Sequence, residues 1–279
     1  MTIRFSLKFL PDYPYCQLYY FAKMKNFGNF KNPKTFNEKI NWRKLYDHNP
    51  LYTKLSDKYA VREYIAEKIG EEYLVPLLGV WNNVNEIDFD KLPSKFVLKC
   101  THDSGSIVIC KDKGDFDTEK AKKKLNICQK KNFYWQAREW QYKDMEPKII
   151  AEKYLVDESS IELKDYKIFC FGGKPEFIQV DFNRFNGHKR NLYDTDWNFC
   201  DFEIKYPSNK NIKIKKPSQL ENMLHLAEIL SKEHSHVRVD FYIAENRIYF
   251  GELTFTHGGG FEKFKPSQYD RKIGDLWKI

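Results

Sequence analysis

The chain has 279 residues, of which 42% are hydrophobic and 16% aromatic, so it can fill one large domain or two smaller ones, and a disordered chain is excluded. The net charge of +8 indicates anionic partners, but the lysines are spread along the chain without a nucleic-acid-binding module, so we expect no nucleic-acid partner. Six scattered cysteines without a C-x-x-C pair, no signal peptide and no long apolar run predict a cytoplasmic protein with free thiols and no transmembrane segment.

The first segment, residues 1 to about 55, is aromatic and basic and is punctuated by prolines. A short helix is predicted over residues 18–24. A second is predicted over residues 36–46, because Thr35 and Glu38 have the spacing of a capping box. This segment contains a cluster of aromatic residues: Tyr13, Tyr15, Tyr19, Tyr20, Phe21, Phe27 and Phe30. Such a cluster more often belongs to the hydrophobic core and its rim than to a sugar-binding platform or an interface.

The middle of the chain alternates predicted helices and strands. Ser56 or Asp57 is expected to cap a helix over residues 58–69, and an edge strand follows over 74–80 because Pro76 interrupts it. Strands are predicted over 95–100 and 107–110, with the polar loop 101–106 between them, and a lysine-rich helix over 117–132. Another strand covers 148–155.

The last part predicts antiparallel pairing. Strands over 166–171 and 176–181 are joined by a glycine-rich turn, and a helix over 218–233 precedes a hairpin of strands 237–242 and 248–254. His234 and His236 are interpreted as an exposed loop pair. The mixture predicts an α+β protein with several antiparallel strand pairs.

The final hairpin is the most informative segment. Asp240 and Glu252 lie on its neighbouring strands, where two carboxylates repel each other unless a cation lies between them. Mg²⁺ is the expected cation, because it favours carboxylates together with phosphate oxygens. Arg238 lies two residues before Asp240, so it shares that face and offers a fork for phosphate. The alternative is an ordinary hairpin with exposed charges.

Four other features are weaker candidates for parts of a functional site than this hairpin. Lys99 ends an apolar strand and needs an anionic partner or an exit to water. The small residues of the loop after it allow backbone amides to approach a phosphate, although they also make ordinary turns. Lys167 has the same pattern but shares its strand face with Asp165, and Glu152 lies where an apolar strand becomes polar.

Other chemistries lack their motifs. No Walker loop, G-x-G-x-x-G, H-E-x-x-H or G-x-S-x-G sequence is present. Asp194-Thr195-Asp196 matches the D-x-D motif of a metal-dependent glycosyltransferase, but it fits a hairpin turn better.

Several segments together resemble the ATP-grasp superfamily, and more closely its TupA-like branch, which is named for teichuronopeptide synthesis. The resemblance runs from about Thr35 to the C-terminus, and the ordered markers are residues 36–40, 57–62, 96–106, 165–167, 237–240 and 251–254. It implies an ATP-grasp fold in which two α+β lobes grip ATP. The implied division is a helical segment over 1–55, a first lobe over 56–150 and a second lobe over 151–279.

The resemblance also implies roles for individual residues. Lys58 and Lys99 match lysines that reach the nucleotide, and Asp165 matches a ribose-binding acid. Lys167 is expected to face phosphate. The mobile phosphate cover corresponds to the loop with Thr101, His102, Ser104, Gly105 and Ser106, and the adenine hinge corresponds to Glu152, Tyr154 and Leu155.

The catalytic end follows the same resemblance. Arg238 matches the arginine that steadies an acyl phosphate, and Asp240 and Glu252 match Mg²⁺ ligands. The superfamily pattern after the second acid is Glu-x-Asn, whereas this chain has Thr254 there, which puts the second metal position in doubt. The segment expected to contact the substrate is His257, Gly258, Gly259 and Gly260, in which His257 either orients the acceptor or acts as a base, or else caps the loop.

The implied activity is an ATP- and Mg²⁺-dependent carboxylate–amine ligation through an acyl phosphate. The branch implies a uronic acid of a bacterial capsular or other cell-surface polysaccharide as the acid, and a small amine or amino acid as its partner. A glycosyltransferase of the same pathway and a glycan-binding lobe without catalysis are the alternatives. The sequence does not indicate an oligomeric state.

Overall fold

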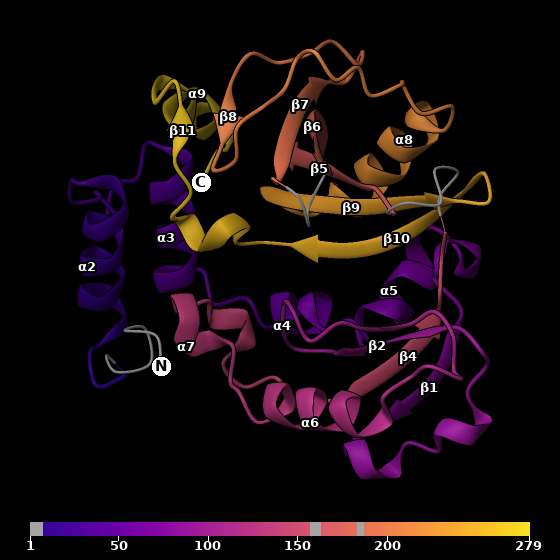
Figure 1. Ribbon diagram of the computed structural model, residues 1–279. Coiled ribbons are helices and arrows are strands. Elements are labelled where there is room, and N and C mark those ends of the chain that lie inside the picture. The colour runs from indigo at the N-terminus through magenta and orange to yellow at the C-terminus, as the bar shows by residue number, and fades with distance from the viewer. Residues whose placement is uncertain (1–7, 157–162, 183–186) are drawn as a thin grey trace.

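The computed structural model describes residues 8–156, 163–182 and 187–279. Residues 1–7, where the sequence predicts no signal peptide, lie outside the described part. Two sheets stand one above the other, with helices between and around them (Figure 1). The lower sheet uses strands between residues 77 and 153, and the upper one uses strands between residues 165 and 254. The α+β class with antiparallel pairing is therefore confirmed, whereas the division at residues 55 and 150 stays a prediction.

The lower sheet has the strand order β1-β4-β2-β3 and is antiparallel throughout. Its strands are β1 (Leu77–Trp81), β2 (Phe96–Cys100), β3 (Val108–Cys110) and β4 (Ile149–Lys153). The helix α6 (Thr118–Gln129) packs beneath it, and Asp117 caps this helix by accepting a hydrogen bond from the backbone of Lys120. The edge position of β1 agrees with its proline-interrupted sequence.

The upper sheet has the order β10-β9-β5-β6-β7, again antiparallel. Its strands are β5 (Asp165–Phe171), β6 (Lys174–Phe182), β7 (Lys189–Asp194), β9 (His236–Ala244) and β10 (Arg247–Thr254), and the helix α8 (Leu220–Ser231) packs on it. The turn between β9 and β10 holds Glu245 and Asn246 at φ of 52° and 58°. Both values are those of a two-residue turn, and the strand pairing confirms the hairpin that the sequence predicted.

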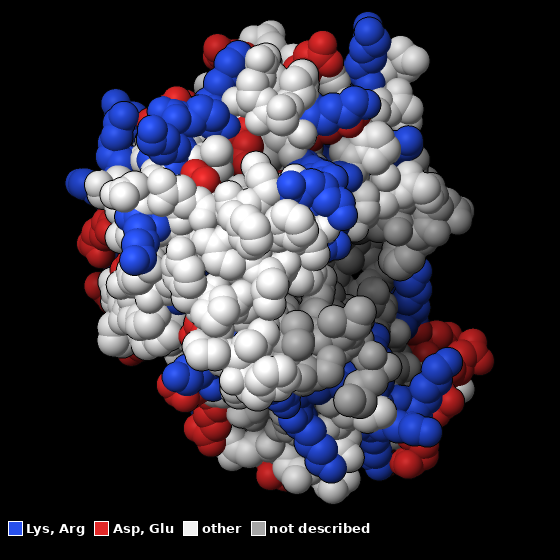
Figure 2. Space-filling view, turned by 90° about the vertical axis from the view of Figure 1, so that its left-hand side faces the viewer, with Lys and Arg blue, Asp and Glu red and all other residues white. Residues whose placement is uncertain are grey.

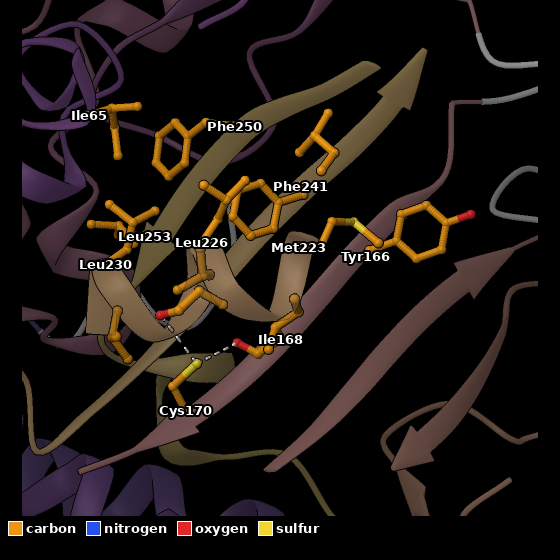
Figure 3. Packing of buried hydrophobic residues seen from close by; sticks show 14 of the residues in the cluster. Ile65, Tyr166, Ile168, Cys170, Met223, Leu226, Leu230, Phe241, Phe250 and Leu253 are labelled. Atoms are coloured by element: carbon orange, nitrogen blue, oxygen red, sulfur yellow. Dashed lines mark hydrogen bonds between the residues drawn. The ribbon is translucent and has the colours of Figure 1, made fainter. Parts of the chain in front are cut away.

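Hydrophobic side chains cover both faces of the upper sheet, and polar ones interrupt one of them. One core joins the sheet to α8 and α5, and Figure 3 shows Ile168, Phe241 and Leu226 within it. On the opposite face, Phe169 and Phe177 pack against helical residues such as Phe36. The remaining part of that second face carries the polar side chains of the candidate site.

The remaining elements surround the two sheets. The helices are α2 (Asp12–Met24), α3 (Phe36–Tyr46), α4 (Pro50–Ser56), α5 (Val61–Lys68), α7 (Tyr134–Ala137) and α9 (Gln268–Leu276), and the short strands are β8 (Glu203–Ile204) and β11 (Phe264–Lys265). The 3-10 turns are η1 (Glu71–Tyr73), η2 (Val84–Glu86), η3 (Phe89–Lys91), η4 (Trp140–Tyr142) and η5 (His257–Gly260). The predicted capping box of α3 is present, since Thr35 accepts from the backbone of Glu38 while the Glu38 carboxylate accepts from the backbone of Thr35.

Some sequence predictions were wrong in detail. The helix expected from residue 58 begins at Val61, because the Asp57 carboxylate accepts hydrogen bonds from the backbones of Tyr59 and Ala60 and holds a turn there instead. His234 and His236 are buried rather than exposed. His236 begins β9, and its Nδ1 contacts the carbonyl oxygen of Cys170 on the neighbouring strand at 2.8 Å.

The N-terminal aromatic residues divide into core and rim. Tyr15, Tyr20 and Phe30 are buried, whereas Phe21 and Phe27 are exposed and stack on each other. Figure 2 shows the side of the molecule on which α2 lies, where lysine and arginine side chains gather above and below a broad uncharged area.

All six cysteines are free. Burial raises the pKa of the Cys100 and Cys170 thiols to about 12, so both stay protonated. Within the described part of the chain, no helix has the length and apolar character needed to cross a membrane.

Candidate active site

The candidate site lies on the polar face of the upper sheet. Side chains alternate along β9, so that Val237 and Val239 enter the hydrophobic core while Arg238 and Asp240 point to the opposite face. On the neighbouring strand β5, Lys167 pairs in register with Asp240. Adjacent strands therefore place a lysine, an aspartate and an arginine next to one another.

A β-bulge at Gly251 brings a second carboxylate to this face. Phe250 is paired with Phe241, and Glu252, not Gly251, is paired with Asp240. In a regular strand Glu252 would share the face of Phe250 and point into the core. A side chain at residue 251 would bring its Cβ within 3.0 Å of the Asp240 carbonyl oxygen. Glycine therefore permits the bulge that directs Glu252 to the site.

Arg238 binds both carboxylates. Its Nε and Nη2 donate to Asp240 Oδ1 and Oδ2, each at 2.6 Å, and Nη2 also donates to Glu252 Oε1 at 2.6 Å. Burial alone would lower the pKa of the guanidinium, but the two carboxylates reverse this and raise it. Burial alone would raise the pKa of Glu252, but Arg238 and Lys167 lower it. Arg238 and Glu252 are therefore charged at neutral pH, whereas burial raises the pKa of Asp240 against the opposing effect of Arg238 and Lys167.

Lys167 completes this cluster from β5. Its ammonium lies 2.6 Å from Asp240 Oδ2 and 3.1 Å from Asp165 Oδ2. Burial acts to lower the pKa of Lys167, and the carboxylates of Asp165 and Asp240 outweigh burial and raise it. Lys167 thus carries a fixed positive charge on the floor of the site.

His257 joins Arg238 to the next group of charges. Arg238 Nη1 lies 2.8 Å from His257 Nδ1, and because arginine can only donate, Nδ1 accepts. His257 Nε2 lies 3.1 Å from Glu262 Oε2. Burial lowers the pKa of His257 to about 4, opposed by Glu262, so the ring is neutral at pH 7 with its proton on Nε2.

A second ionic cluster lies beyond His257. Arg190 Nε contacts Asp181 Oδ1 at 2.7 Å and Arg190 Nη1 contacts Glu262 Oε2 at 3.2 Å, while the Lys205 ammonium lies 2.9 Å from Glu262 Oε1. Burial alone would raise the pKa of the Glu262 carboxyl, but His257, Arg190 and Lys205 hold it well below its usual range. The charged surface of the site therefore extends across β6, β7 and the segment after η5.

The loop between β2 and β3 closes over the site from the lower sheet. Ser106 Oγ accepts from the Cys100 amide at 2.7 Å and donates to Asp103 Oδ1 at 2.5 Å, and the Lys58 ammonium donates to the Asp103 carbonyl oxygen. Gly105, at the tip, has φ of 130° and open space where a side chain would lie. The loop is fixed at its base, and its backbone is accessible at its tip.

Lys99, Glu152 and Arg62 form an ionic group beside this loop. The Lys99 ammonium lies 2.6 Å from Glu152 Oε2, and Arg62 Nη1 lies 3.5 Å from Glu152 Oε1. Lys99 points to this side because Leu98 and Cys100 alternate with it into the lower core. Burial lowers the pKa of Arg62, opposed by Glu152.

Two adjoining cavities contain these groups. The first, here called the loop pocket, lies between the two sheets and is lined by Lys58, Arg62, Leu74, Lys99, Asp103, Ser104, Gly105, Ser106, Ile107, Glu152, Tyr242, Phe250, Gly251 and Glu252. The second, the central cleft, has a volume of about 770 Å³ and contains Lys167, Arg238, Thr254 and His257 among its lining residues. Lys58, Asp103, Ser104 and Glu252 line both, so the cavities are continuous. Their combined size suits a substrate of the dimensions usual for small-molecule sites.

Most of the residues proposed from the sequence line one of these cavities. Those in the loop pocket are Lys58, Lys99, Ser104, Gly105, Ser106, Glu152 and Glu252, and those in the central cleft include Lys167, Arg238, Thr254, His257, Gly258 and Gly259. Asp165 and Asp240 lie beneath this surface as partners of Lys167.

Five other proposed residues do not line either cavity; they are Thr101, His102, Tyr154, Leu155 and Gly260. Thr101 Oγ1 accepts from the backbone of Lys148, and the ring of His102 contacts the Lys131 carbonyl oxygen at 2.9 Å. Leu155 is buried in a small apolar cluster. Their proposed roles at the nucleotide and substrate stay predictions.

Several lining residues were missed by the sequence reasoning. They are Arg62, Glu139, Tyr142, Gln179, Arg190, Lys205 and Glu262. Arg190 stands in the polar run His188-Lys189-Arg190-Asn191, for which the sequence predicted no strand, so it gave no signal either. Glu139 and Tyr142 lie in a segment without helical or strand periodicity, so no sequence signal indicated them.

The oxygen donors on the polar face fit Mg²⁺. Glu252 Oε1 accepts from Arg238 and from the Thr254 hydroxyl, whereas no hydrogen bond among the described residues reaches Glu252 Oε2, on a side chain that is 41% exposed. Each carboxylate oxygen has two lone pairs, so Asp240 Oδ1 keeps one acceptor position beyond its bond from Arg238. Hard oxygen donors of this kind are those that Mg²⁺ prefers.

Two antiparallel sheets, each packed with helices, face a common cleft. This is the ATP-grasp fold that the sequence resemblance implied. The chain belongs to the TupA-like ATP-grasp family, which matches it over residues 38–278. The helix α2 precedes the matched region. None of the curated protein sequences matches this chain.

Three solved structures illustrate its likeness to ligases. D-alanine–D-alanine ligase from Bacillus anthracis has a TM-score of 0.42 at 16% identity, over 80% of this chain and 66% of that one. L-amino acid ligase from Bacillus licheniformis has a TM-score of 0.46 at 13% identity, over 84% and 50%. The ATP-grasp ligase PsnB with a precursor variant, Mg and ADP has a TM-score of 0.40 at 8% identity, over 79% and 58%. The match covers only about half to two thirds of the length of these proteins.

Proposed function

We propose that this protein is an ATP-dependent carboxylate–amine ligase that forms an amide bond through an acyl phosphate. We further propose that its acid substrate is a uronic acid of a capsular or other cell-surface polysaccharide and that its second substrate is a small amine or amino acid. The observation that carries the proposal is the cluster of Lys167, Arg238, Asp240 and Glu252 beside the junction of the loop pocket and the central cleft.

The loop pocket suits the nucleotide phosphates. Lys58 and Lys99 supply positive charge there, and the accessible backbone at Ser104 and Gly105 can approach phosphate oxygens. Glu152, which holds Lys99, lies at the end of β4, where the family has its adenine hinge. In this assignment the nucleotide replaces part of the contact between Lys99 and Glu152.

The cluster on the sheet suits the reacting groups. A carboxylate that attacks a phosphoryl group brings like charges together, so catalysis consists mainly of positioning and neutralisation. Arg238 and Lys167 supply fixed positive charge, and the bidentate bonds to Asp240 hold the guanidinium in one orientation. Asp240 and Glu252, with the Thr254 hydroxyl, would hold Mg²⁺, which when bound neutralises phosphate charge.

His257 orients Arg238 in this proposal. Its Nδ1 lone pair already accepts from Arg238 and its ring is neutral, so His257 is not available as the general base that the sequence left open. The neighbouring Gly258 and Gly259 have φ of 58° and 63°, which keeps the segment close to the cleft without bulky side chains.

The rest of the central cleft suits an anionic saccharide. Among the described residues that line it are eight lysines and arginines but four aspartates and glutamates, so the cleft attracts acids. At one end of the cleft, the ring of Tyr19 from α2 lies edge-to-face against the ring of Phe261, with 4.4 Å between the ring centroids. The Lys23 ammonium lies over the Tyr19 ring. Aromatic faces flanked by exposed lysines are suited to a sugar ring that bears a carboxylate.

The first experiment measures ADP release from ATP and Mg²⁺ with glucuronic acid-type acceptors, with and without a panel of amines, and identifies products by mass spectrometry. ADP together with a product lighter by one water than acid plus amine is expected. The Asp240→Asn variant should abolish both. UDP release from a sugar nucleotide, without ADP, would assign the chain to the glycosyltransferases instead. Release of neither ADP nor UDP, together with no ATP binding in a titration, would contradict any ATP-dependent activity.

A glycosyltransferase has little support in the geometry. Asp194 Oδ1 accepts from the backbones of Asp196 and Asn198, at 3.0 and 2.7 Å, so this carboxylate holds the turn after β7. The hairpin turn that the sequence favoured for Asp194-Thr195-Asp196 is confirmed.

A further inference from the structure

A buried glutamine lies next to the ionic cluster on the polar face of the upper sheet. Ile178 and Val180 enter the hydrophobic core, so Gln179, between them on β6, points to the opposite face, and it lines the central cleft. In the register of the sheet, Gln179 lies beside Lys167, which itself lies beside Asp240. The row of side chains across β9, β5 and β6 therefore runs from the ionic cluster to an uncharged amide.

The orientation of the Gln179 amide is fixed by Asp181. Gln179 Nε2 donates to Asp181 Oδ2 at 2.9 Å, and Asp181 Oδ1 also binds Arg190 Nε at 2.7 Å. Burial alone would raise the pKa of the Asp181 carboxyl, but Arg190 and Lys167 hold it well below its usual range, so this carboxylate only accepts. Asp181 therefore requires the NH₂ group of Gln179 on its own side, and the amide oxygen lies on the other side.

The amide oxygen of Gln179 has no hydrogen-bond partner among the described residues, although the side chain is fully buried. An acceptor left unpaired away from water is costly and therefore uncommon in folded proteins. The Lys167 ammonium does not satisfy it, since its contacts in the described part of the chain are with Asp240 and Asp165. These contacts leave one of the three N–H groups of Lys167 without an acceptor. The floor of the cleft thus presents a donor and an acceptor side by side.

This pair of groups is complementary to an acid that also carries a hydroxyl group. Side chains opposite each other on paired strands have Cβ atoms about 4.5–5.5 Å apart, so one small ligand can meet both. An oxygen of the ligand carboxylate would accept from Lys167, and a hydroxyl of the same ligand would donate to Gln179. In a uronic acid the hydroxyl nearest to the carboxylate is on C4, because C5 bears the ring oxygen.

A neutral hydroxyl suits this position better than an ammonium group does. The cations nearest to Gln179 in the sheet are Lys167 on β5 and Arg190, which binds the same Asp181 as Gln179 does. An ammonium group between these cations would need a carboxylate of its own, and Asp181 already binds Arg190. The amide oxygen carries no charge that would compensate for the repulsion. The amine substrate is therefore expected elsewhere in the cleft.

We propose that Gln179 determines the acid specificity of the cleft by accepting a hydrogen bond from a hydroxyl group of the acid substrate, which in a uronic acid is the hydroxyl on C4. The inference rests on the proposed ligase function and deepens it, because it names the part of the substrate that is recognised. Gln179 acts on substrate choice and not on phosphoryl transfer. An acid without this hydroxyl leaves the amide oxygen unpaired, so the cleft discriminates against it.

The test compares acids that differ at C4. D-glucuronic acid, D-galacturonic acid, which has the opposite configuration at C4, and the 4-deoxy acid common to both are each given with ATP and Mg²⁺. The acyl phosphate is trapped with hydroxylamine, and the hydroxamate is measured. The selectivity ratio is kcat/KM for the better of the two epimers divided by kcat/KM for the 4-deoxy acid. Calorimetric titration of the same acids into the protein with ADP and Mg²⁺ measures this ratio for binding.

The variant is Gln179→Met, which has a similar length but no acceptor, and the control is Gln268→Met, at an exposed position on α9. The natural protein should prefer the better epimer over the 4-deoxy acid by about tenfold or more. In Gln179→Met the ratio should fall to within about twofold of one, and in Gln268→Met it should not change. Loss of the bond to Asp181 affects every acid alike, so the ratio isolates the contact with the hydroxyl. An unchanged ratio in Gln179→Met would overturn the proposal.

The remaining outcomes separate this proposal from the ligase function. No hydroxamate from any of these acids with the natural protein would contradict a uronic acid ligase, and the hydroxyl contact with it. Hydroxamate at equal kcat/KM from the epimers and the 4-deoxy acid would leave the ligase standing and overturn the hydroxyl contact alone. A Gln179→Met protein that keeps the ratio but has a higher KM for glycine in amide formation would assign the amide oxygen to the amine. If Gln179→Met does not fold, Gln179→Asn, which withdraws the amide by one carbon, decides by the same ratio.

Discussion

Asp240 and Glu252 face each other across the β9–β10 pair, and a single nitrogen, Arg238 Nη2, lies 2.6 Å from an oxygen of each. Two neighbouring carboxylates are stable on this face because the guanidinium lies between them. The pairing exists only because the bulge at Gly251 shifts Glu252 by one position. The backbone and the ionic cluster therefore depend on one another.

Gly251→Ala should disturb both the backbone of the β9–β10 pair and the ionic cluster. The added Cβ would lie 3.0 Å from the Asp240 carbonyl oxygen and 3.1 Å from the Tyr242 ring, so strands β9 and β10 must move apart. We expect the free energy of unfolding to fall by about 1–3 kcal/mol and ADP formation to fall with it. Denaturant unfolding and steady-state kinetics measure the two effects.

Gly114→Ala is the matched control. A Cβ at Gly114 would meet only a carboxylate oxygen of Asp112, at 3.4 Å, so this substitution should leave unfolding within about 0.5 kcal/mol of the natural value. Equal stability of the two variants would show that the bulge tolerates a side chain.

Arg238→Lys tests the fork that holds the two acids. Lysine carries the same charge but cannot donate in parallel to both oxygens of Asp240 while it reaches Glu252. We expect kcat to fall by about 10²- to 10³-fold, as for the loss of other transition-state donors, with a much smaller change in the KM for ATP. Arg247→Lys, at an exposed position on β10, should have no effect. A kcat for Arg238→Lys close to the natural value would contradict the catalytic assignment.

Lys99→Met tests the loop pocket. Lys99 is largely buried against Glu152, at 2.6 Å, beside the backbone that we assign to phosphate binding. Removal of its charge should raise the KM for ATP by about tenfold or more, a loss of about 1.4 kcal/mol in binding, without a comparable change for the acid substrate. Lys95→Met, at an exposed residue just before β2, is the control. A KM for ATP that does not change would place the nucleotide elsewhere.

Buried neutral histidines predict a loss of stability in mild acid. Burial lowers the pKa of His234 to about 4 and that of His236 well below its usual value, whereas both take up a proton below about 6.5 in the unfolded chain. The unfolded state therefore binds more protons, and stability that is complete above about pH 6.5 falls as the pH decreases toward 4.

The slope of the unfolding free energy against pH identifies the histidines responsible. Each such histidine contributes about 1.4 kcal/mol per pH unit within that window, so His234→Gln should flatten the pH dependence of the unfolding free energy by about this amount. His225→Gln, at an exposed site on α8, should leave the slope unchanged. A His234→Gln slope equal to that of the natural protein would mean that His234 is charged in the folded state.

The sequence predicted the elements that have a local signal. The capping box of α3, the β9–β10 hairpin and the alternation around Arg238 are all set by residues close in sequence, and all three are present. The start of α5 was missed because the Asp57 carboxylate accepts two backbone amides and delays the helix.

The parts of the site that were not predicted depend on contacts between distant segments. Arg190 and Glu262 meet although 72 residues separate them, and Glu139 meets Thr256 across 117 residues. His236 reads as part of a polar loop in the sequence, yet it is buried because it begins a central strand. No periodicity or capping pattern carries such information, so these contacts could only be found from the fold.

Thr254 is where this chain departs from the Glu-x-Asn pattern of the superfamily, and its contact predicts the consequence. Its hydroxyl donates to Glu252 Oε1 at 2.9 Å, beside the bond from Arg238, so it orients Glu252 and leaves Oε2 open for Mg²⁺. Thr254→Val removes this orientation and should raise the Mg²⁺ concentration for half-maximal ADP formation by about threefold or more, whereas Thr254→Asn supplies an amide oxygen and should lower it. Titration of Mg²⁺ into protein treated with EDTA measures all three forms. Identical midpoints would show that residue 254 has no part in holding the metal, because a ligand and a residue that orients a ligand would each shift the midpoint.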